Sequence, residues 1–176
     1  VNDGKAIKND LIYGSVSGKK VDEDGNALGG AMIGLFRTDD GEFTKENALM
    51  TTTSAEDGSF SFENIPCGTW YVREIEQPTG FVLDDTIYPV TIGTDGQVVE
   101  IEIVNEYGRG NIHLTKVDSE YPDNKLTGAV FEVYKDSNNN SKLDEGDELL
   151  GTLTEKEIGE YGMNDLFYGR YFVKET

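Results

Sequence analysis

A long internal repeat limits the folds open to this chain. The segment GSVSGKKVDEDGNALGGAMIGLF, which starts at residue 14, returns as GNIHLTKVDSEYPDNKLTGAVFEVY from residue 110. A second segment, EDGSFSFENIPCGTWYVREIE from residue 56, returns as EIGEYGMNDLFYGRYFVKET from residue 157. The repeat is longer than the units that stack into solenoids, so each copy can own a hydrophobic core.

The alignment of the copies predicts the domain organisation. It places Lys20 on Lys116, Ala31 on Ala129, Gly68 on Gly169 and Glu74 on Glu175. The segment IEIVNEYGRG from residue 101 also echoes AIKNDLIYG from residue 6, which places Asn105 on Asn9. We therefore expect the tail strand of a preceding repeat in 1–13, a complete repeat in 14–108, and a second repeat in 109–176 that is cut before its last strands.

Short alternating segments predict an all-β chain. Residues at every second position share one strand face in segments such as Ala31–Leu35, Trp70–Glu74 and Val99–Asn105, and no long stretch keeps a helical period. Turn sequences (EDG at 23, EDG at 56 and TDG at 94) separate these segments. The spacing is typical of tandem immunoglobulin-like β-sandwich domains.

The charge excludes two classes of partner. The chain has 34 acidic and 15 basic residues, a formal charge of -19. A surface of this sign repels phosphate and anionic lipid, so we expect neither nucleic-acid nor membrane binding.

Cys67 is the one cysteine, which excludes an internal disulfide, and we expect it half-buried in a loop. We see no signal peptide, sorting signal or membrane span, and expect an excised fragment.

Three polar residues occupy faces that are otherwise apolar. Lys20, Glu74 and Asn105 lie in phase with hydrophobic neighbours, so alternation turns all three inward. These neighbours include Val16, Val72 and Ile103. A buried charge is costly unless it is paired, so the convergence of three such residues indicates a site.

The residues around these three positions carry a family resemblance. The patterns KKVDEDGNALGGA, KVDSEYPDNKLTGA, YVREIEQPTGF and YFVKET resemble the B-type repeats of staphylococcal collagen adhesin and the SpaA-type domains of Gram-positive pilins. The resemblance covers nearly the whole chain. It implies a prealbumin-like sandwich with a spontaneous isopeptide bond, joining Lys20 to Asn105 with Glu74 as the helper acid.

The implied chemistry is consistent with burial. An apolar site lowers the pKa of a lysine and raises that of a glutamate, so Lys20 can attack as a neutral amine while Glu74 stays protonated. Glu74 could then polarise the Asn105 carbonyl and move protons as ammonia leaves. The alternative is a non-covalent Lys20–Glu74 ion pair with Asn105 as a hydrogen-bonding neighbour. Ile33, where the second repeat has Phe131, indicates that shielding of the site differs between the copies.

The second repeat contains only part of this site. Lys116 and Glu175 are the equivalents of Lys20 and Glu74, but no downstream strand brings an asparagine to them. We therefore expect Lys116 to be unlinked. The strand around Asn9 could instead fill the gap in a neighbouring molecule, because open sheet edges accept added strands.

A twelve-residue acidic loop predicts a calcium site. DSNNNSKLDEGD places side-chain oxygens at positions 1, 3, 5, 9 and 12. The corresponding residues are Asp136, Asn138, Asn140, Asp144 and Asp147, with the carbonyl of Lys142 at position 7. Ser141 replaces the usual turn glycine and Asp147 the longer glutamate, so a weak site is expected. A solvated hairpin loop remains the alternative.

Together these features favour a structural role. One histidine, His113, and one cysteine cannot build a zinc site, and neither a catalytic triad nor a phosphate-binding loop is recognisable. We expect no organic cofactor and no turnover, but a stalk module of a secreted, cell-wall-associated adhesin or pilin that contacts neighbouring repeats. The alternatives are a domain that binds host protein or glycan and an accessory sandwich of a secreted carbohydrate-active enzyme.

Overall fold

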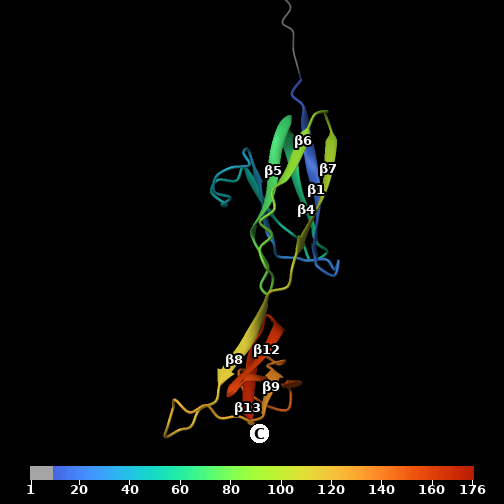
Figure 1. Ribbon diagram of the computed structural model, residues 1–176. Coiled ribbons are helices and arrows are strands. Elements are labelled where there is room, and N and C mark those ends of the chain that lie inside the picture. The colour runs from blue at the N-terminus through green and yellow to red at the C-terminus, as the bar shows by residue number, and fades with distance from the viewer. Residues whose placement is uncertain (1–9) are drawn as a thin grey trace, which may run out of the picture. The chain divides into compact units, whose positions relative to one another are not determined.

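The chain folds entirely into β-structure in the part that the structure describes. A computed structural model describes residues 10–176, which form thirteen strands and no helix (Figure 1). The chain divides into two compact units, here called unit 1 (through Glu106) and unit 2 (Tyr107–Thr176). The tail strand expected around Asn9 lies outside the described residues.

Unit 1 contains seven strands in two sheets. The strands are β1 (Tyr13–Asp22), β2 (Met32–Phe36), β3 (Met50–Thr53), β4 (Ser59–Pro66), β5 (Gly68–Glu76), β6 (Tyr88–Ile92) and β7 (Gln97–Asn105). One sheet has the order β4-β1-β7 and the other β3-β2-β5-β6. The first strand, β1, runs antiparallel to β4 but parallel to the last strand, β7. This parallel register sets Lys20 opposite Ile103 and Asp22 opposite Asn105.

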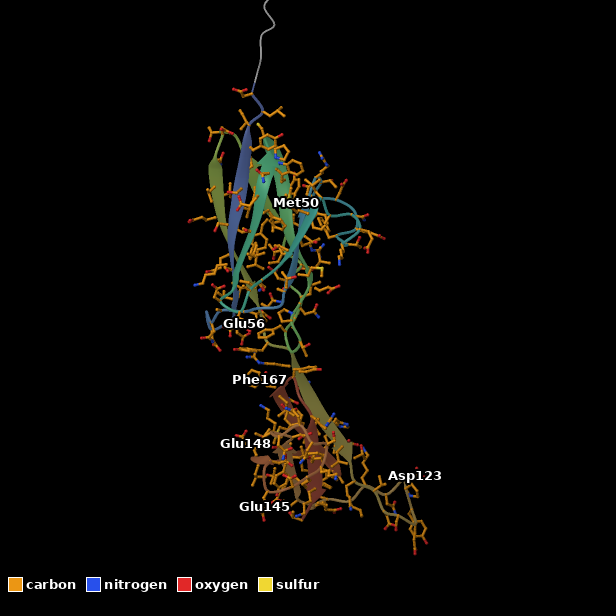
Figure 2. All side chains as sticks on the ribbon, turned by 180° about the vertical axis from the view of Figure 1, so that it is seen from behind. Met50, Glu56, Asp123, Glu145, Glu148 and Phe167 are labelled. Atoms are coloured by element: carbon orange, nitrogen blue, oxygen red, sulfur yellow. The ribbon has the colours of Figure 1, made fainter. Side chains whose placement is uncertain are left out.

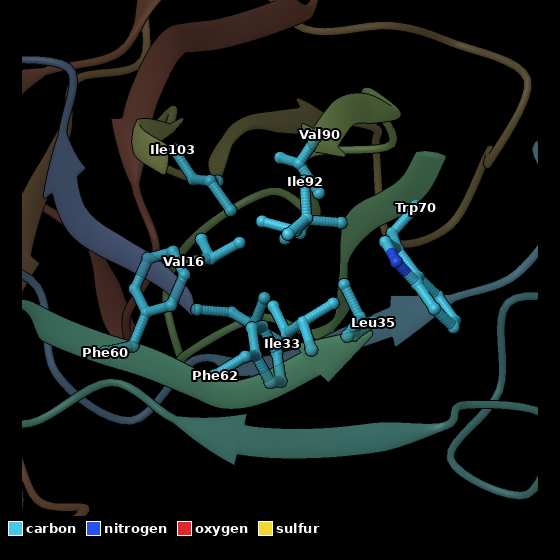
Figure 3. Packing of buried hydrophobic residues seen from close by; sticks show 11 residues of the cluster. Val16, Ile33, Leu35, Phe60, Phe62, Trp70, Val90, Ile92 and Ile103 are labelled. Carbon is cyan, nitrogen blue, oxygen red and sulfur yellow. The ribbon is translucent and has the colours of Figure 1, made fainter. Parts of the chain in front are cut away.

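The core of unit 1 lies between these two sheets. Alternate residues of each strand point inward, as the sequence predicts, and Ala31, Ile33 and Leu35 are all buried. Figure 3 shows the side chains of both sheets meeting, with Val16 and Ile103 facing Val90 and Ile92. Burial of each such side chain contributes roughly 1.5–3 kcal/mol to the stability of the fold. The core residues therefore determine which face of each strand points inward.

Unit 2 contains six strands that repeat part of this plan. They are β8 (Arg109–Thr115), β9 (Phe131–Lys135), β10 (Glu148–Thr152), β11 (Thr154–Glu157), β12 (Glu160–Phe167) and β13 (Tyr171–Glu175). Its sheets have the orders β11-β12-β8 and β10-β9-β13. The connection from β8 to β9 extends away from the strands, with Asp123 at its far end (Figure 2). The core is smaller, with Phe131, Val133, Leu153 and Tyr161 buried.

The structure confirms the exposure expected for His113 but not the burial expected for Cys67. His113 is exposed, as predicted, and its Nε2 lies 2.9 Å from a Glu160 carboxylate oxygen. We expected Cys67 to be half-buried, but it is exposed, because it is the single residue that links β4 of one sheet to β5 of the other and lies outside the core between them. No helix of the described residues could cross a membrane.

Candidate functional site

The three polar residues singled out by alternation meet inside unit 1. Lys20 comes from β1, Asn105 from the end of the neighbouring β7, and Glu74 from β5 of the facing sheet. Their exposed fractions are 0%, 1% and 1%. The prediction that all three point inward is therefore confirmed, and the site joins both sheets.

Asn105 is held in one orientation by its amide nitrogen. Nδ2 donates to Glu74 Oε2 at 2.8 Å and Oε1 at 3.1 Å, and to the main-chain carbonyl of Val82 at 2.8 Å. The carbonyl oxygen Oδ1 is buried and has no hydrogen-bond partner among the described residues. A buried oxygen without a partner is unfavourable by about 1–3 kcal/mol, which is typical of a site arranged for something other than stability.

Glu74 therefore contacts a different atom from the one expected. We expected it to polarise the Asn105 carbonyl, but it lies against the amide nitrogen, which would leave as ammonia. The reason is the Val82 carbonyl, an acceptor that fixes Nδ2 on this side of the amide. Of the two roles expected for Glu74, the contacts support proton transfer at the leaving nitrogen.

Lys20 reaches the same site from β1. Its Nζ donates to the main-chain carbonyls of Ile103, at 3.1 Å, and Val21, at 3.3 Å. Both acceptors are neutral, so within the described residues the hydrogen bonds of the ammonium go to the main chain rather than to Glu74 as in the alternative ion pair. Neutral acceptors hold the amine in place without strongly favouring its protonated form.

Burial shifts the pKa of both ionisable groups toward their neutral forms. Desolvation lowers the pKa of Lys20, and the nearby carboxylates, Glu74 first, offset only part of this effect. Desolvation likewise raises the pKa of Glu74, against the hydrogen bonds from the Asp84 amide and from Asn105. A neutral amine beside a protonated carboxyl is the combination that amide formation requires.

A segment that the sequence reasoning missed completes the site. The main-chain amide of Asp84 donates to Glu74 Oε2 at 2.8 Å, and the Tyr88 hydroxyl donates to Asp84 Oδ2 at 2.7 Å. Burial raises the pKa of Asp84, but hydrogen bonds from Thr86 and Tyr88 outweigh it and lower that pKa. Asp84 is thus an ionised anchor that holds the chain against Glu74.

The two units pair equivalent residues across equivalent strands. Ile33 lies opposite Glu74 on β2 and β5, and Phe131 lies opposite Glu175 on β9 and β13. Both apolar residues are buried, but only Glu74 of unit 1 is buried with its neighbour. The two side chains differ in size, as the sequence comparison indicated.

The equivalent pair in unit 2 lies in the open. Lys116 Nζ is 2.7 Å from Glu175 Oε2, and their side chains are 30% and 48% exposed. No asparagine from the described residues joins them. An ion pair at this exposure contributes little to stability, about 0–1 kcal/mol.

The acidic loop closes around its first residue. Asp136 is buried, and its carboxylate accepts the main-chain N–H groups of Asn140 and Ser141 at 3.1 Å each. Ser141 has φ +64°, the left-handed conformation that glycine favours at this turn. The loop backbone therefore bends where the calcium-loop pattern requires it.

Other cationic and polar groups already use the loop oxygens. The Arg170 guanidinium lies 3.1 Å from Asp136 Oδ2 and also contacts Ser141. The amides of Asn138 and Asn140 donate to Asp144. In the described part of the chain, no group of three or more His, Cys, Asp or Glu side chains is arranged to hold a metal. The oxygen donors suit a hard cation only if Arg170 is displaced.

Unit 2 also has a hollow on its surface. It has a volume of about 330 Å³ and lies between the start of β8 and the connection from β12 to β13. Its lining includes Arg109, Leu166, Phe167, Tyr168 and Tyr171. Aromatic side chains in a shallow hollow are a feature that the ligand-binding alternative would use.

Comparisons with known proteins identify the family of both units. The family of SpaA prealbumin-like fold domains matches residues 14–107 and, a second time, residues 110–176. No curated protein matches the chain significantly.

Solved structures of two pilins and of one further bacterial protein share the fold. The chain is 28% identical to the Bacillus anthracis TIE protein, with a TM-score of 0.75 over 94% of this chain and 28% of that one. It is 26% identical to a streptococcal ancillary pilin, with a TM-score of 0.51 over 96% of this chain and 54% of that one. BcpA, the major pilin subunit of Bacillus cereus, is 14% identical with a TM-score of 0.51 and shares the fold alone. The chain thus spans about a quarter to just over half of these proteins.

Proposed function

The chain belongs to the SpaA family of prealbumin-like domains, and we propose that it is a structural module in the stalk of a Gram-positive surface adhesin or pilin, crosslinked by a bond between Lys20 and Asn105. The observation that carries this proposal is the burial of Lys20, Glu74 and Asn105 in one site. The Asn105 amide contacts Glu74, and Lys20 contacts the strand that carries Asn105.

The crosslink would form in a single event. The neutral amine of Lys20 attacks Cγ of Asn105, so that the Nζ–Cγ bond forms and the Cγ–Nδ2 bond breaks. One proton passes from Nζ through the Glu74 carboxyl to Nδ2, which leaves as ammonia, so the carboxyl ends as it began. Folding holds the reacting groups together and so provides a high effective concentration. The protein is modified once, and this step is maturation rather than turnover.

The position of the bond suits a protein that is pulled from both ends. Lys20 lies near the end of β1, and Asn105 is the last residue of β7, the parallel neighbour of β1. A pulling force applied along β1 would pass through the Lys20–Asn105 bond to the end of β7, where the chain leaves unit 1. The residues between them would carry no tension, and unit 1 would resist unfolding without a disulfide.

The similar structures support a proposal for location and partners. The similar structures include a streptococcal ancillary pilin that is 26% identical to this chain. We propose that this chain also acts on the cell surface, secreted and wall-associated, and that it contacts neighbouring repeats of its own protein. The acidic surface is consistent with a soluble exterior.

The mass of the intact chain tests the crosslink. Under denaturing conditions the purified chain should be lighter than its sequence by one ammonia. Lys20→Ala, Glu74→Ala and Asn105→Ala should each have the full mass expected from their sequences. Lys19→Ala, which removes an exposed lysine beside the site, should keep the deficit. A full-length mass for the unaltered chain would contradict the proposal.

We further propose that the loop from Asp136 to Asp147 is a weak calcium site. Its oxygen donors and its closed turn support this, and Arg170 is the competing cation. Calorimetric titration should give a Kd of about 10⁻⁴–10⁻³ M, the range of extracellular calcium modules. Arg170→Ala should tighten binding and Asp144→Ala should abolish it. Asp123→Ala, outside the loop, is the matched control, and equal weak binding by all the variants would mean nonspecific association.

The ligand-binding alternative has one supporting feature. The aromatic hollow in unit 2 could contact a host protein or a glycan, because Phe167 and Tyr168 are 49% and 67% exposed there. This role and the stalk role use different parts of the molecule. The crosslink experiment therefore bears on the stalk role alone.

A further inference from the structure

The connection from β5 to β6 passes over the buried site of unit 1. Residues 77–87 form this connection, and two of them turn main-chain groups toward the site. The Val82 carbonyl accepts a hydrogen bond from Asn105 Nδ2 at 2.8 Å. The Asp84 amide donates to Glu74 Oε2, also at 2.8 Å. One short segment therefore contacts both the amide that would leave and the acid that would transfer the proton.

The Val82 carbonyl determines which way the Asn105 amide faces. If the amide turned by half a rotation, its oxygen Oδ1 would lie against the Val82 carbonyl, and two acceptors repel each other. The observed orientation instead gives Nδ2 two acceptors, the Val82 carbonyl and the Glu74 carboxyl. Proton transfer from Glu74 to the leaving nitrogen therefore depends on the position of one main-chain carbonyl.

A hydrogen bond between two side chains fastens this segment to the sheet. Residues 82–87 belong to no strand. Asp84 Oδ1 accepts the main-chain N–H of Thr86 at 3.0 Å, and Oδ2 accepts the Tyr88 hydroxyl at 2.7 Å. Tyr88 begins β6, which is paired with β5, and its side chain packs against the core. The irregular segment is thus held by a residue whose own position is fixed by the sheet.

The state of both groups makes this hydrogen bond strong. Burial raises the pKa of Tyr88, and the hydrogen bond to Asp84 adds to this effect, so the hydroxyl keeps its proton and donates. Because Asp84 is ionised, the bond is charge-assisted, and such bonds are roughly twice as strong as those between neutral groups. Both side chains are half-buried, which limits competition from water.

The segment has the site on one side and solvent on the other. A surface hollow of about 190 Å³ borders its outer side, with Leu83 and Asp85 in the lining. The Val82 side chain is exposed there, whereas Asn105 and Glu74 beneath the segment are buried. Displacement of the segment would admit water to the reacting groups. Water would compete for their hydrogen bonds and weaken the electrostatic interactions between them.

We propose that Asp84 and Tyr88 are positioning residues for the crosslink of unit 1, and that the hydrogen bond between them holds segment 82–84 against the leaving amide and the helper acid. This role rests on the proposed function, because it concerns the rate of that crosslink. The bonds that form and break, and the path of the proton, are those of the crosslink itself. The side chains of Asp84 and Tyr88 act through the main chain and exchange no proton with the reacting atoms.

The rate of ammonia loss tests the proposal. The full chain, recovered in denaturant before it has folded, is refolded by dilution, quenched in acid at intervals and analysed by mass spectrometry. The fluorescence of Trp70, the one tryptophan, follows the folding of unit 1 in the same samples. Tyr88→Phe, which removes only the hydroxyl, should slow ammonia loss about 10-fold. Asp84→Ala should slow it roughly 100-fold, the effect of about 1 Å of misplacement. Asp85→Ala, which changes the exposed neighbour, should keep the rate of the unaltered chain.

Two comparisons separate positioning from a loss of stability. Rates are compared only among chains that Trp70 fluorescence shows to be folded, so a smaller folded fraction cannot imitate a slower reaction. The chain with both Asp84→Ala and Tyr88→Phe should react no more slowly than Asp84→Ala alone, because both changes break the same hydrogen bond. Asp84→Asn, which keeps an oxygen that can accept the Tyr88 hydroxyl, should recover part of the rate.

The possible failures are distinguishable. If the unaltered chain loses ammonia and the folded Tyr88→Phe and Asp84→Ala chains lose it equally fast, the positioning role is overturned and the proposed function stands. Equal slowing by Asp85→Ala would also overturn it, because any change in the segment would then have the same effect. If the unaltered chain keeps its full mass, the proposed function fails and the positioning role fails with it. Should Asp84→Ala not fold, Tyr88→Phe, which keeps the ring, decides the outcome.

Discussion

Lys20→Met is expected to lower the melting temperature of unit 1 by roughly 20 °C, since a crosslink that closes a loop of about 85 residues contributes on the order of 4–5 kcal/mol and each kcal/mol shifts the melting temperature of a domain this size by about 4–8 °C. Methionine keeps most of the volume of lysine and leaves no charge in the core. The change therefore isolates the crosslink. Scanning calorimetry of the full chain should show the shift in one transition, while the transition of unit 2 stays in place.

The direction of this shift distinguishes the two interpretations of the site. Without a crosslink, replacing a buried lysine by an apolar residue is neutral or stabilising, because the desolvation penalty of the charge disappears. An unchanged or raised melting temperature would therefore favour the non-covalent cluster. Glu74→Ala should be more damaging than Lys20→Met, because it also removes the acceptor of the Asn105 amide and leaves the Lys20 amine in a cavity.

Alternation along the strands was enough to find the three buried polar residues. Lys20, Glu74 and Asn105 each lie in phase with buried apolar residues, and one-face burial is a local property that a period of two reveals. The repeat then identified Lys116 and Glu175 as equivalents. The fold class followed from the same pattern, because short alternating strands separated by turns have few compact solutions.

Contacts through main-chain atoms or between distant segments could not be predicted. The Val82 carbonyl and the Asp84 amide hold the site, but they lie in an irregular segment, and any residue type could provide those atoms. Arg170 reaches Asp136 from another part of the chain, so the spacing of the acidic loop gave no sign of it. Val173 matches the buried Val72 in the repeat but is 42% exposed, because among the described residues β13 is an edge strand, whereas β5 has β6 beside it.

Gly58→Ala is expected to destabilise unit 1 by about 3 kcal/mol or more and to slow the formation of the crosslink, because backbone strain and steric overlap add. Gly58 has φ +77°, and a Cβ there would lie 2.3 Å from the main-chain carbonyl oxygen of Lys20. Its own carbonyl accepts the Lys20 amide at 2.7 Å. An added methyl group must therefore push away the strand segment that carries Lys20.

Gly25→Ala is the matched control for this prediction. Gly25 has a similar φ of +82°, but no atom lies within 4 Å of the position that an added methyl group would take, so only strain applies and the loss should be about 1 kcal/mol. Denaturant unfolding should separate the two variants, and the mass of refolding samples over time should show slower ammonia loss for Gly58→Ala alone. Equal losses in both variants would mean that contact with Lys20 is irrelevant. Gly159 has φ +71°, and its carbonyl oxygen accepts the Lys116 amide in the same way, so the turn that positions the lysine is part of the repeat itself.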